Sequence, residues 1–172
     1  YRETVRRVSM EYPETQFAMI NDRTLGQLNI SNIFFNENDG AYLAGVFAAS
    51  ATKRRSVGFV GSEPELFASF NKGVKDTSAR VKVLNIPFPD DISALKKSLA
   101  KVDIAYSTWD GDATVLTTII DNFKGKVRLI SEAPDQFFAA LPGAQKVMIA
   151  RVEKNLVKPI DQLVGAALEG RS

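Results

Sequence analysis

The 172-residue sequence contains no cysteine and no histidine. Without these side chains, the protein cannot build a Cys or His zinc site, a thiol nucleophile, a Ser-His-Asp triad or an imidazole acid-base catalyst. The lack of cysteine also leaves no disulfide framework or buried thiol from which to infer a redox compartment. Any catalysis would have to use carboxylates, Lys, Tyr or Ser.

Long apolar runs are missing as well. No segment approaches the ~18 to 20 apolar residues of a membrane span. Neither Gly-x-Gly-x-x-Gly nor a glycine-rich loop ending in Gly-Lys-Ser/Thr occurs, so dinucleotide binding and nucleotide hydrolysis lose their usual support. The chain begins at Tyr1 without Met or a signal peptide, and we expect a mature or trimmed fragment.

The composition is that of a globular protein, with 45% hydrophobic and 24% charged residues. The net charge of +2 gives little reason to expect a nucleic-acid partner. Basic residues cluster at Arg6-Arg7 and at Lys53 to Arg55. No aromatic residues are interleaved with them, which favours solvated helix ends over a single-strand binding surface.

From Ser56 onward, short β-branched runs alternate with amphipathic helical patterns. We expect strands at 57–60, 81–86, 104–106, 127–130 and 145–152, and earlier ones at 16–20 and 33–35. Helices are expected at 1–12, at 40–53, between the later strands, and from a start between 155 and 159. This alternation predicts an α/β fold with a parallel sheet and helices on both faces.

Polar residues are expected to start several of these helices. Asp39, Asp90 and Asp91 are candidate caps, and Ser62 and Glu65 have capping-box spacing. The composition changes most clearly at Arg54 and Arg55. We therefore expect 1–54 to be part of an N-terminal lobe, 55–154 a C-terminal α/β lobe, and 155–172 a helix returning toward the lobe interface.

In open parallel sheets, ligands bind beyond the carboxyl ends of the strands. One such end holds Trp109 between polar residues, flanked by Asp110 and Asp112. An indole can stack on a planar ring while carboxylates accept hydrogen bonds from hydroxyl groups. The alternative is structural: either Asp can cap the following helix, and Trp109 can pack over the sheet edge.

Three further candidates follow the next strands. Glu132 and Asp135 can accept hydrogen bonds from ribose-like hydroxyls or an ammonium group, and Lys154 can donate to a ligand oxygen. Asp135 follows Pro134 at an expected helix start, where a negative charge is also stabilised by the helix dipole. A lysine at a helix start opposes that dipole, which favours a binding role for Lys154.

Two adjoining segments resemble the basic membrane protein family, the substrate-binding lipoproteins of ABC transporters that include purine nucleoside receptors. They are GAYLAGVFAAS, beginning at Gly40, and TKRRSVGFVG, beginning at Thr52. Phe70 and Gly73 match the family's F-x-x-G, Asp135-Gln136 its Asp-Gln, and Lys154-Asn155 its Lys-Asn. The resemblance covers the chain from about Glu11 to the C-terminus.

This resemblance implies a type I periplasmic-binding-protein-like fold, with two lobes closing on a ligand and the N-terminal lobe incomplete in this chain. It implies a solute-binding protein for ABC-type uptake of a nucleoside-like small molecule, located outside the cytoplasm, at the cell surface or in the periplasm, as a lipoprotein. Lys154 matches the lysine that reaches the nucleoside sugar, and Glu132 or Asp135 replaces the sugar-binding aspartate. The family's glycine-rich A-G-G-x-G loop is replaced here by residues 108–112, so we expect an altered pocket.

The expected partners are the small-molecule ligand and an ABC transporter permease, with membrane attachment only through a lipid anchor outside this chain. A second hypothesis keeps the fold but makes it the ligand-sensing domain of a regulatory protein. A third is enzymatic: Asp110, Asp112, Glu132 and Asp135 together with Lys154 could hold Mg²⁺ for phosphoryl chemistry. The binding-protein interpretation agrees best with the quoted segments, and with it we expect no enzyme activity, no cofactor and no metal.

Overall fold

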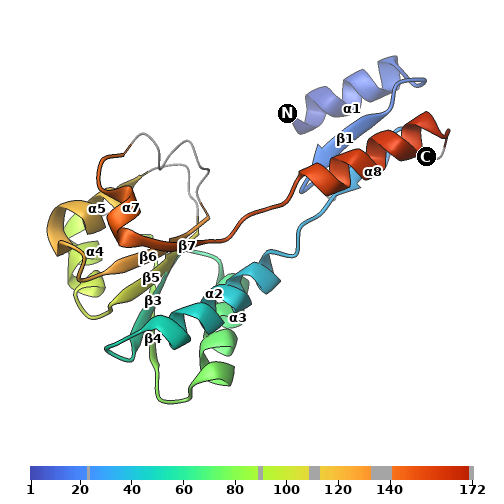
Figure 1. The fold of residues 1–172 in the computed structure, drawn as a ribbon. Coiled ribbons are helices and arrows are strands. Elements are labelled where there is room, and N and C mark those ends of the chain that lie inside the picture. The colour runs from blue at the N-terminus through green and yellow to red at the C-terminus, as the bar shows by residue number, and fades with distance from the viewer. Residues whose placement is uncertain (23, 89–90, 109–112, 133–140, 171–172) are drawn as a thin grey trace. The chain divides into compact units, whose positions relative to one another are not determined.

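The computed structural model describes the chain except residues 23, 89–90, 109–112, 133–140 and 171–172. It divides into two compact units (Figure 1). Unit 1 consists of Tyr1–Asn36 and Lys154–Ser172, and unit 2 is Glu37–Glu153. The lobe boundary expected at residue 54 lies within unit 2, because the helix before it packs tightly against the helix after it.

Unit 2 is built on a five-stranded parallel sheet. Its strands are β3 (Ser56–Val60), β4 (Lys82–Ile86), β5 (Ile104–Ser107), β6 (Arg128–Ser131) and β7 (Met148–Arg151). The spatial order is β4-β3-β5-β6-β7. The chain therefore adds β4 on one side of β3 and then crosses back to add the others on the opposite side. The predicted parallel α/β sheet is confirmed.

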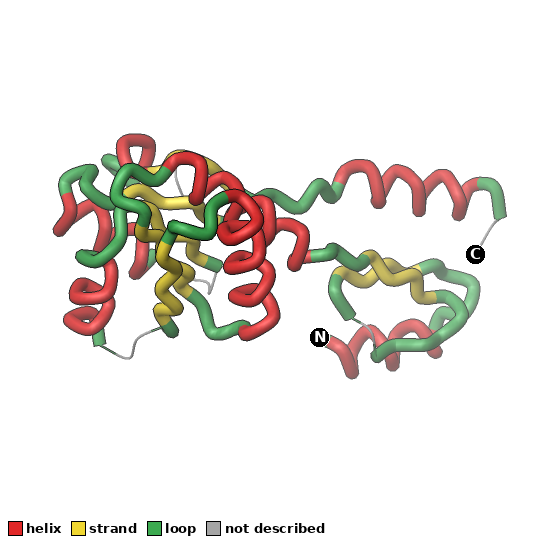
Figure 2. Tube along the Cα trace, turned by 90° about the horizontal axis from the view of Figure 1, so that it is seen from below, coloured by secondary structure: helices red, strands yellow, loops and turns green. Residues whose placement is uncertain are grey.

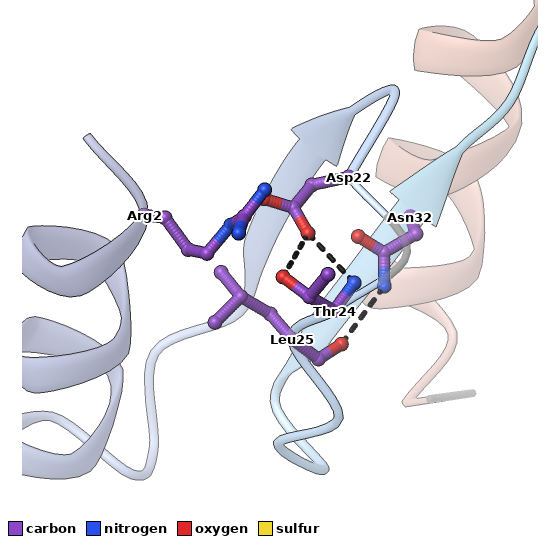
Figure 3. Close-up of polar contacts among 5 residues, drawn as sticks. All are labelled: Arg2, Asp22, Thr24, Leu25 and Asn32. Carbon is purple, nitrogen blue, oxygen red and sulfur yellow. Dashed lines mark hydrogen bonds and ion pairs between the residues drawn. The ribbon is translucent and has the colours of Figure 1, made fainter.

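Helices cover both faces of this sheet (Figure 2). Successive side chains of a strand point to opposite faces, so Phe59 packs with α2 (Glu37–Ala51) and α3 (Pro64–Thr77) on one face. Val60 packs on the other face with α4 (Ile92–Leu99), α5 (Thr114–Phe123) and α7 (Ala144–Val147). The uninterrupted apolar strands follow from this two-sided burial.

Two glycines bring α2 and α3 into backbone contact. A Cβ at Gly45 would lie 2.2 Å from the Phe70 carbonyl oxygen, and a Cβ at Gly73 would lie 2.1 Å from the Tyr42 carbonyl oxygen. The small residues of α2 thus serve helix packing, and they hold α2 in unit 2.

The amino end of the sheet is fixed by buried Asp103, the residue before β5. Its carboxylate accepts hydrogen bonds from Thr52 Oγ1 (2.5 Å), Lys53 N (2.7 Å) and Arg54 N (3.0 Å). Burial raises the pKa of Asp103, but these hydrogen bonds outweigh it and hold the pKa below its usual value. Asp103 thereby joins the end of α2 to the start of β5.

Unit 1 contains α1 (Arg2–Glu11), α8 (Val157–Leu168) and the parallel pair β1 (Phe17–Ile20) and β2 (Ile30–Ile33). Buried Asn29 donates its side-chain amide to the carbonyls of Ser9, Tyr12 and Thr15, which fixes the turn after α1.

Four expectations about local structure were wrong in detail. The expected strand 145–152 begins as the helical turn α7, because Gly143 has φ +88° and Ala144 and Val147 are buried at helical spacing; only β7 is extended. The strand expected at 33–35 is β2, three residues earlier. Helix α2 starts at Glu37, before the expected Asp39 cap. The residue before α3 is Glu63, with no side-chain capping bond, so Ser62 and Glu65 form no capping box.

Asp91 was correctly expected to cap a helix, since its carboxylate accepts from Ser93 N at 2.8 Å.

In the described part of the chain, no helix is both long enough and apolar enough to cross a membrane.

Candidate functional site

The strand order identifies one edge of the sheet in unit 2 as the place for a ligand. The chain direction across the sheet reverses between β3 and β5, and open α/β sheets bind ligands beyond the carboxyl ends of the strands at that point. Gly61, Ser62 and Glu63 follow β3, and Thr108 follows β5. Glu132 follows β6, the next strand.

Tyr106 occupies the inner side of this edge. Its ring is fully buried among aromatic side chains, with ring centroids 5.7 Å from Phe59 and 5.4 Å from Phe70. Its hydroxyl donates a hydrogen bond to Glu132 Oε1. Burial raises the pKa of Tyr106 strongly, and the carboxylates of Glu132, Glu37 and Glu63 raise it further. Tyr106 therefore stays protonated. Its hydroxyl acts as a fixed hydrogen-bond donor that orients the Glu132 carboxylate.

Glu63 is positioned by two donors. Its Oε2 accepts from Ser62 N at 3.0 Å and from Thr108 Oγ1 at 3.3 Å. Gly61 allows this approach, because a Cβ there would lie 2.7 Å from Thr108 Oγ1. The ends of β3 and β5 are thus joined through side chains at the carboxyl edge.

The described residues at this edge supply mainly hydrogen-bond acceptors. Glu63, Glu132 and Glu37 bring carboxylates into the surroundings of the Tyr106 hydroxyl. Carboxylates accept hydrogen bonds and cannot donate them when ionised. The arrangement suits a ligand that offers hydroxyl, amino or ammonium donors. Among the described residues, no group of three or more Asp or Glu side chains is arranged to hold a metal ion.

The structure locates only part of the predicted site. Glu132 lies at the carboxyl edge, as expected for a residue after β6. Trp109, Asp110, Asp112 and Asp135 lie outside the described residues. Lys154 is the first residue of the C-terminal segment that belongs to unit 1, and it is exposed.

Sequence reasoning did not single out Tyr106 or Glu63. Tyr106 lies inside an apolar run, and its place on the same sheet face as Phe59 could have been read from strand alternation. Glu63 lies between Ser62 and Glu65, the two residues expected to form a capping box, and acidic residues are common at a helix start. Both could have been found as polar side chains close to a strand's carboxyl end: Tyr106 is the residue before the last of β5, and Glu63 comes three residues after β3.

Comparison with protein-family models matches half of the chain to a known family. Residues 1–86, half of the chain, match the Bmp model, described as "ABC transporter substrate-binding protein PnrA-like". The chain belongs to the Bmp family. This confirms the family resemblance that the segments beginning at Gly40 and Thr52 indicated, and the Bmp family is a family of substrate-binding proteins and not of enzymes.

Curated relatives agree with the family assignment. The chain is 30% identical over 112 residues to a "CD4+ T-cell-stimulating antigen" of Listeria monocytogenes, covering 62% of this chain and 31% of that protein. It is 33% identical over 108 residues to the "ABC transporter nucleoside-binding protein BmpA" of Lactococcus lactis, covering 62% of this chain and 26% of that protein. These alignments span about a third or less of the length of either relative.

Solved structures share the fold. A transcriptional activator of the comK gene from Bacillus halodurans superposes with a TM-score of 0.71 at 21% identity, covering 98% of this chain and 60% of that one. A glucose-galactose binding protein, GanP, from Geobacillus stearothermophilus gives a TM-score of 0.57 at 13% identity, covering 95% and 65%. The Bmp chain thus has the α/β fold of periplasmic-binding-protein-like solute-binding proteins.

Proposed function

We propose that this Bmp-family chain contributes a binding site for a nucleoside-like small molecule to a solute-binding protein of ABC-type uptake. The observation that carries the proposal is the acceptor-rich carboxyl edge of unit 2, where Glu132 is held by Tyr106 and Glu63 by Thr108. It occurs in a chain whose first half matches a substrate-binding family.

The chemistry of this edge suits a sugar bearing vicinal hydroxyls. Each ribose hydroxyl can donate to a carboxylate, and charge-assisted hydrogen bonds are about twice as strong as neutral ones. In the proposal, Glu132 accepts from the sugar, Trp109 stacks on the base, and Asp110, Asp112 and Asp135 supply further acceptors. Lys154 donates to a ligand oxygen from the segment that follows β7. No bond is made or broken in the ligand.

The proposed partners follow from the family. An ABC transporter permease receives the ligand, and a lipid anchor outside this chain holds the protein at the outer side of the membrane. The name of the Lactococcus lactis relative, a nucleoside-binding protein of an ABC transporter, supports this choice of ligand class.

A second candidate function is ligand sensing by a regulatory protein. It is favoured by the superposition on the Bacillus halodurans transcriptional activator along 98% of this chain. The complete gene distinguishes the two: a lipobox cysteine supports transport, and a fused effector domain supports sensing.

Thermal unfolding of the full chain tests the binding proposal against a panel of purine and pyrimidine nucleosides, free sugars and Mg²⁺. A ligand at about 100 times its Kd adds roughly 2.7 kcal/mol to the free energy of unfolding, which raises Tm by about 5 to 10 °C in a protein of this size. We expect such a shift with nucleosides and none with Mg²⁺. A shift with Mg²⁺ alone would instead support the phosphoryl-transfer hypothesis.

Variants then locate the site. Glu132→Gln is expected to weaken nucleoside binding by at least about tenfold, since a charged hydrogen bond contributes roughly 1.5 to 3 kcal/mol. Trp109→Ala and Lys154→Ala should weaken it as well. Glu14→Gln, an exposed change outside the site, should bind like the wild type. Equal affinity of Glu132→Gln and Glu14→Gln would remove Glu132 from the site.

A further inference from the structure

The amino end of the sheet in unit 2 gathers cations that are scattered along the sequence. Four short segments lead into β3, β4, β5 and β6, at residues 52–55, 78–82, 100–103 and 124–128, and the second and fourth include the first residue of their strand. They carry nine Lys or Arg residues and a single acid, the buried Asp103. The nine are Lys53, Arg54, Arg55, Arg80, Lys82, Lys101, Lys124, Lys126 and Arg128, here called the basic face.

Main-chain hydrogen bonds place these segments side by side. Lys82 N donates to Arg55 O at 2.9 Å, Asp103 N to Ser56 O at 3.1 Å, and Arg128 N to Asp103 O at 2.9 Å. The four segments therefore follow one another along a single edge of the sheet. Eight of the nine basic residues are exposed, and Arg128 is half-buried.

Two guanidinium groups are fixed at this edge. Arg128 Nη2 donates to Ala51 O at 3.0 Å, and Arg54 Nη1 donates to Ala100 O and Val102 O. These partners are neutral carbonyls, so both charges are kept. In the part of the chain that the structure describes, none of the nine side chains forms an ion pair with a carboxylate.

Helix stability does not account for this concentration of charge. A cation stabilises the helix dipole only within the last turn. The last turns of α2 and α5 contain no basic residue, and the basic residues of 52–55 and 124–128 lie beyond those helices. The opposite end of the sheet is acidic, with Glu37, Glu63 and Glu132. Unit 2 is therefore electrically polarised although the whole chain has a net charge of only +2.

We propose that the basic face docks unit 2 on an anionic lipid surface, with the acidic carboxyl edge turned away from the lipid. Cations spread over several short loops fit many mobile headgroups, and each contributes about fivefold to membrane affinity near such a surface. Nucleic acid fits less well, because none of the four segments contains an aromatic residue on which a base could stack. This docking is additional to any lipid anchor and does not depend on the solute.

Co-sedimentation of the full chain with vesicles tests the proposal. We expect binding to vesicles of equal parts phosphatidylglycerol and phosphatidylcholine and none to phosphatidylcholine alone. Binding should fall steeply between about 0.1 and 1 M salt, where the screening length drops from roughly 10 to 3 Å. Equal binding to both vesicle types, or binding to neither, would overturn the proposal.

A charge-matched pair of variants locates the contact. Lys82→Glu/Lys126→Glu should bind the anionic vesicles at least about 25-fold more weakly, because two cations are lost and two anions added. Arg6→Glu/Lys158→Glu makes the same change in net charge at exposed positions of unit 1 and should bind nearly as the wild type does. Equal losses of vesicle binding in the two variants would show an effect of net charge alone. Retention on heparin or duplex DNA without vesicle binding would assign the basic face to another polyanion. Either result would overturn lipid docking.

Discussion

Gly73→Ala is expected to destabilise the protein by about 3 kcal/mol and to lower Tm by roughly 6 to 12 °C. The added Cβ would lie 2.1 Å from the carbonyl oxygen of Tyr42. This obstacle is backbone and cannot rotate away, so α2 and α3 must move apart. Gly45→Ala should behave similarly, since its Cβ would meet the Phe70 carbonyl oxygen at 2.2 Å. Thermal unfolding followed by circular dichroism measures both.

Gly165→Ala is the matched control, because its Cβ would meet no atom within 4 Å. In this helix, alanine should stabilise by up to about 1 kcal/mol, the intrinsic advantage of alanine over glycine. The double variant Gly45→Ala/Gly73→Ala should be destabilised by less than the sum of the two single variants, since moving α2 and α3 apart once makes room for both added Cβ atoms. A Gly73→Ala protein as stable as Gly165→Ala would disprove the close contact.

Asp103→Asn is expected to lower the free energy of unfolding by about 2 kcal/mol at pH 7. The carboxylate accepts from three donors at Thr52, Lys53 and Arg54. In asparagine, an NH2 group replaces one of the two carboxylate oxygens. This donor would face the donors of those residues, and an unsatisfied buried donor costs roughly 1 to 3 kcal/mol. Urea unfolding at pH 7 measures the loss. Asp121→Asn, an exposed change on α5, should have almost no effect.

The destabilisation caused by Asp103→Asn should become smaller at low pH. The pKa of Asp103 is lower in the folded protein than in the unfolded chain, where it is about 3.9. Its stabilising contribution is therefore complete above pH ~4 and is lost as the pH falls through the folded pKa. The difference in stability between wild type and Asp103→Asn should shrink below about pH 4. A difference that stays constant down to pH ~2 would contradict the role of the charged carboxylate.

Much of the fold of unit 2 is predictable because its sheet is buried on both sides. Apolar runs such as that of β3, separated by amphipathic helices, leave few arrangements other than a parallel sheet. The turn at 144–147 was missed because an apolar run is compatible with either a strand or a buried helix, and the left-handed Gly143 decides the outcome. The grouping of α2 with unit 2 depends on Gly45 and Gly73, whose partners are distant in sequence.

The position of a site residue in the sheet was predictable from the sequence, but its hydrogen-bond partner was not. That Glu132 lies at the carboxyl edge follows from its place after a strand. Its hydrogen bond with Tyr106 depends on β5 and β6 being neighbours, which strand spacing alone does not establish. The basic face was missed for the same reason: only the register of β3 to β6 brings its four segments together.

The division of the chain also sets an order of folding during synthesis. Unit 2 is one continuous segment, whereas unit 1 combines residues before and after it. Residues 37–153 leave the ribosome before α8 does, so strands β3 to β7 are all available before α8 can join unit 1. Domains generally fold as units as they emerge. Unit 2 can therefore reach its final structure before α8, the helix that unit 1 receives from the C-terminal segment, has been synthesised.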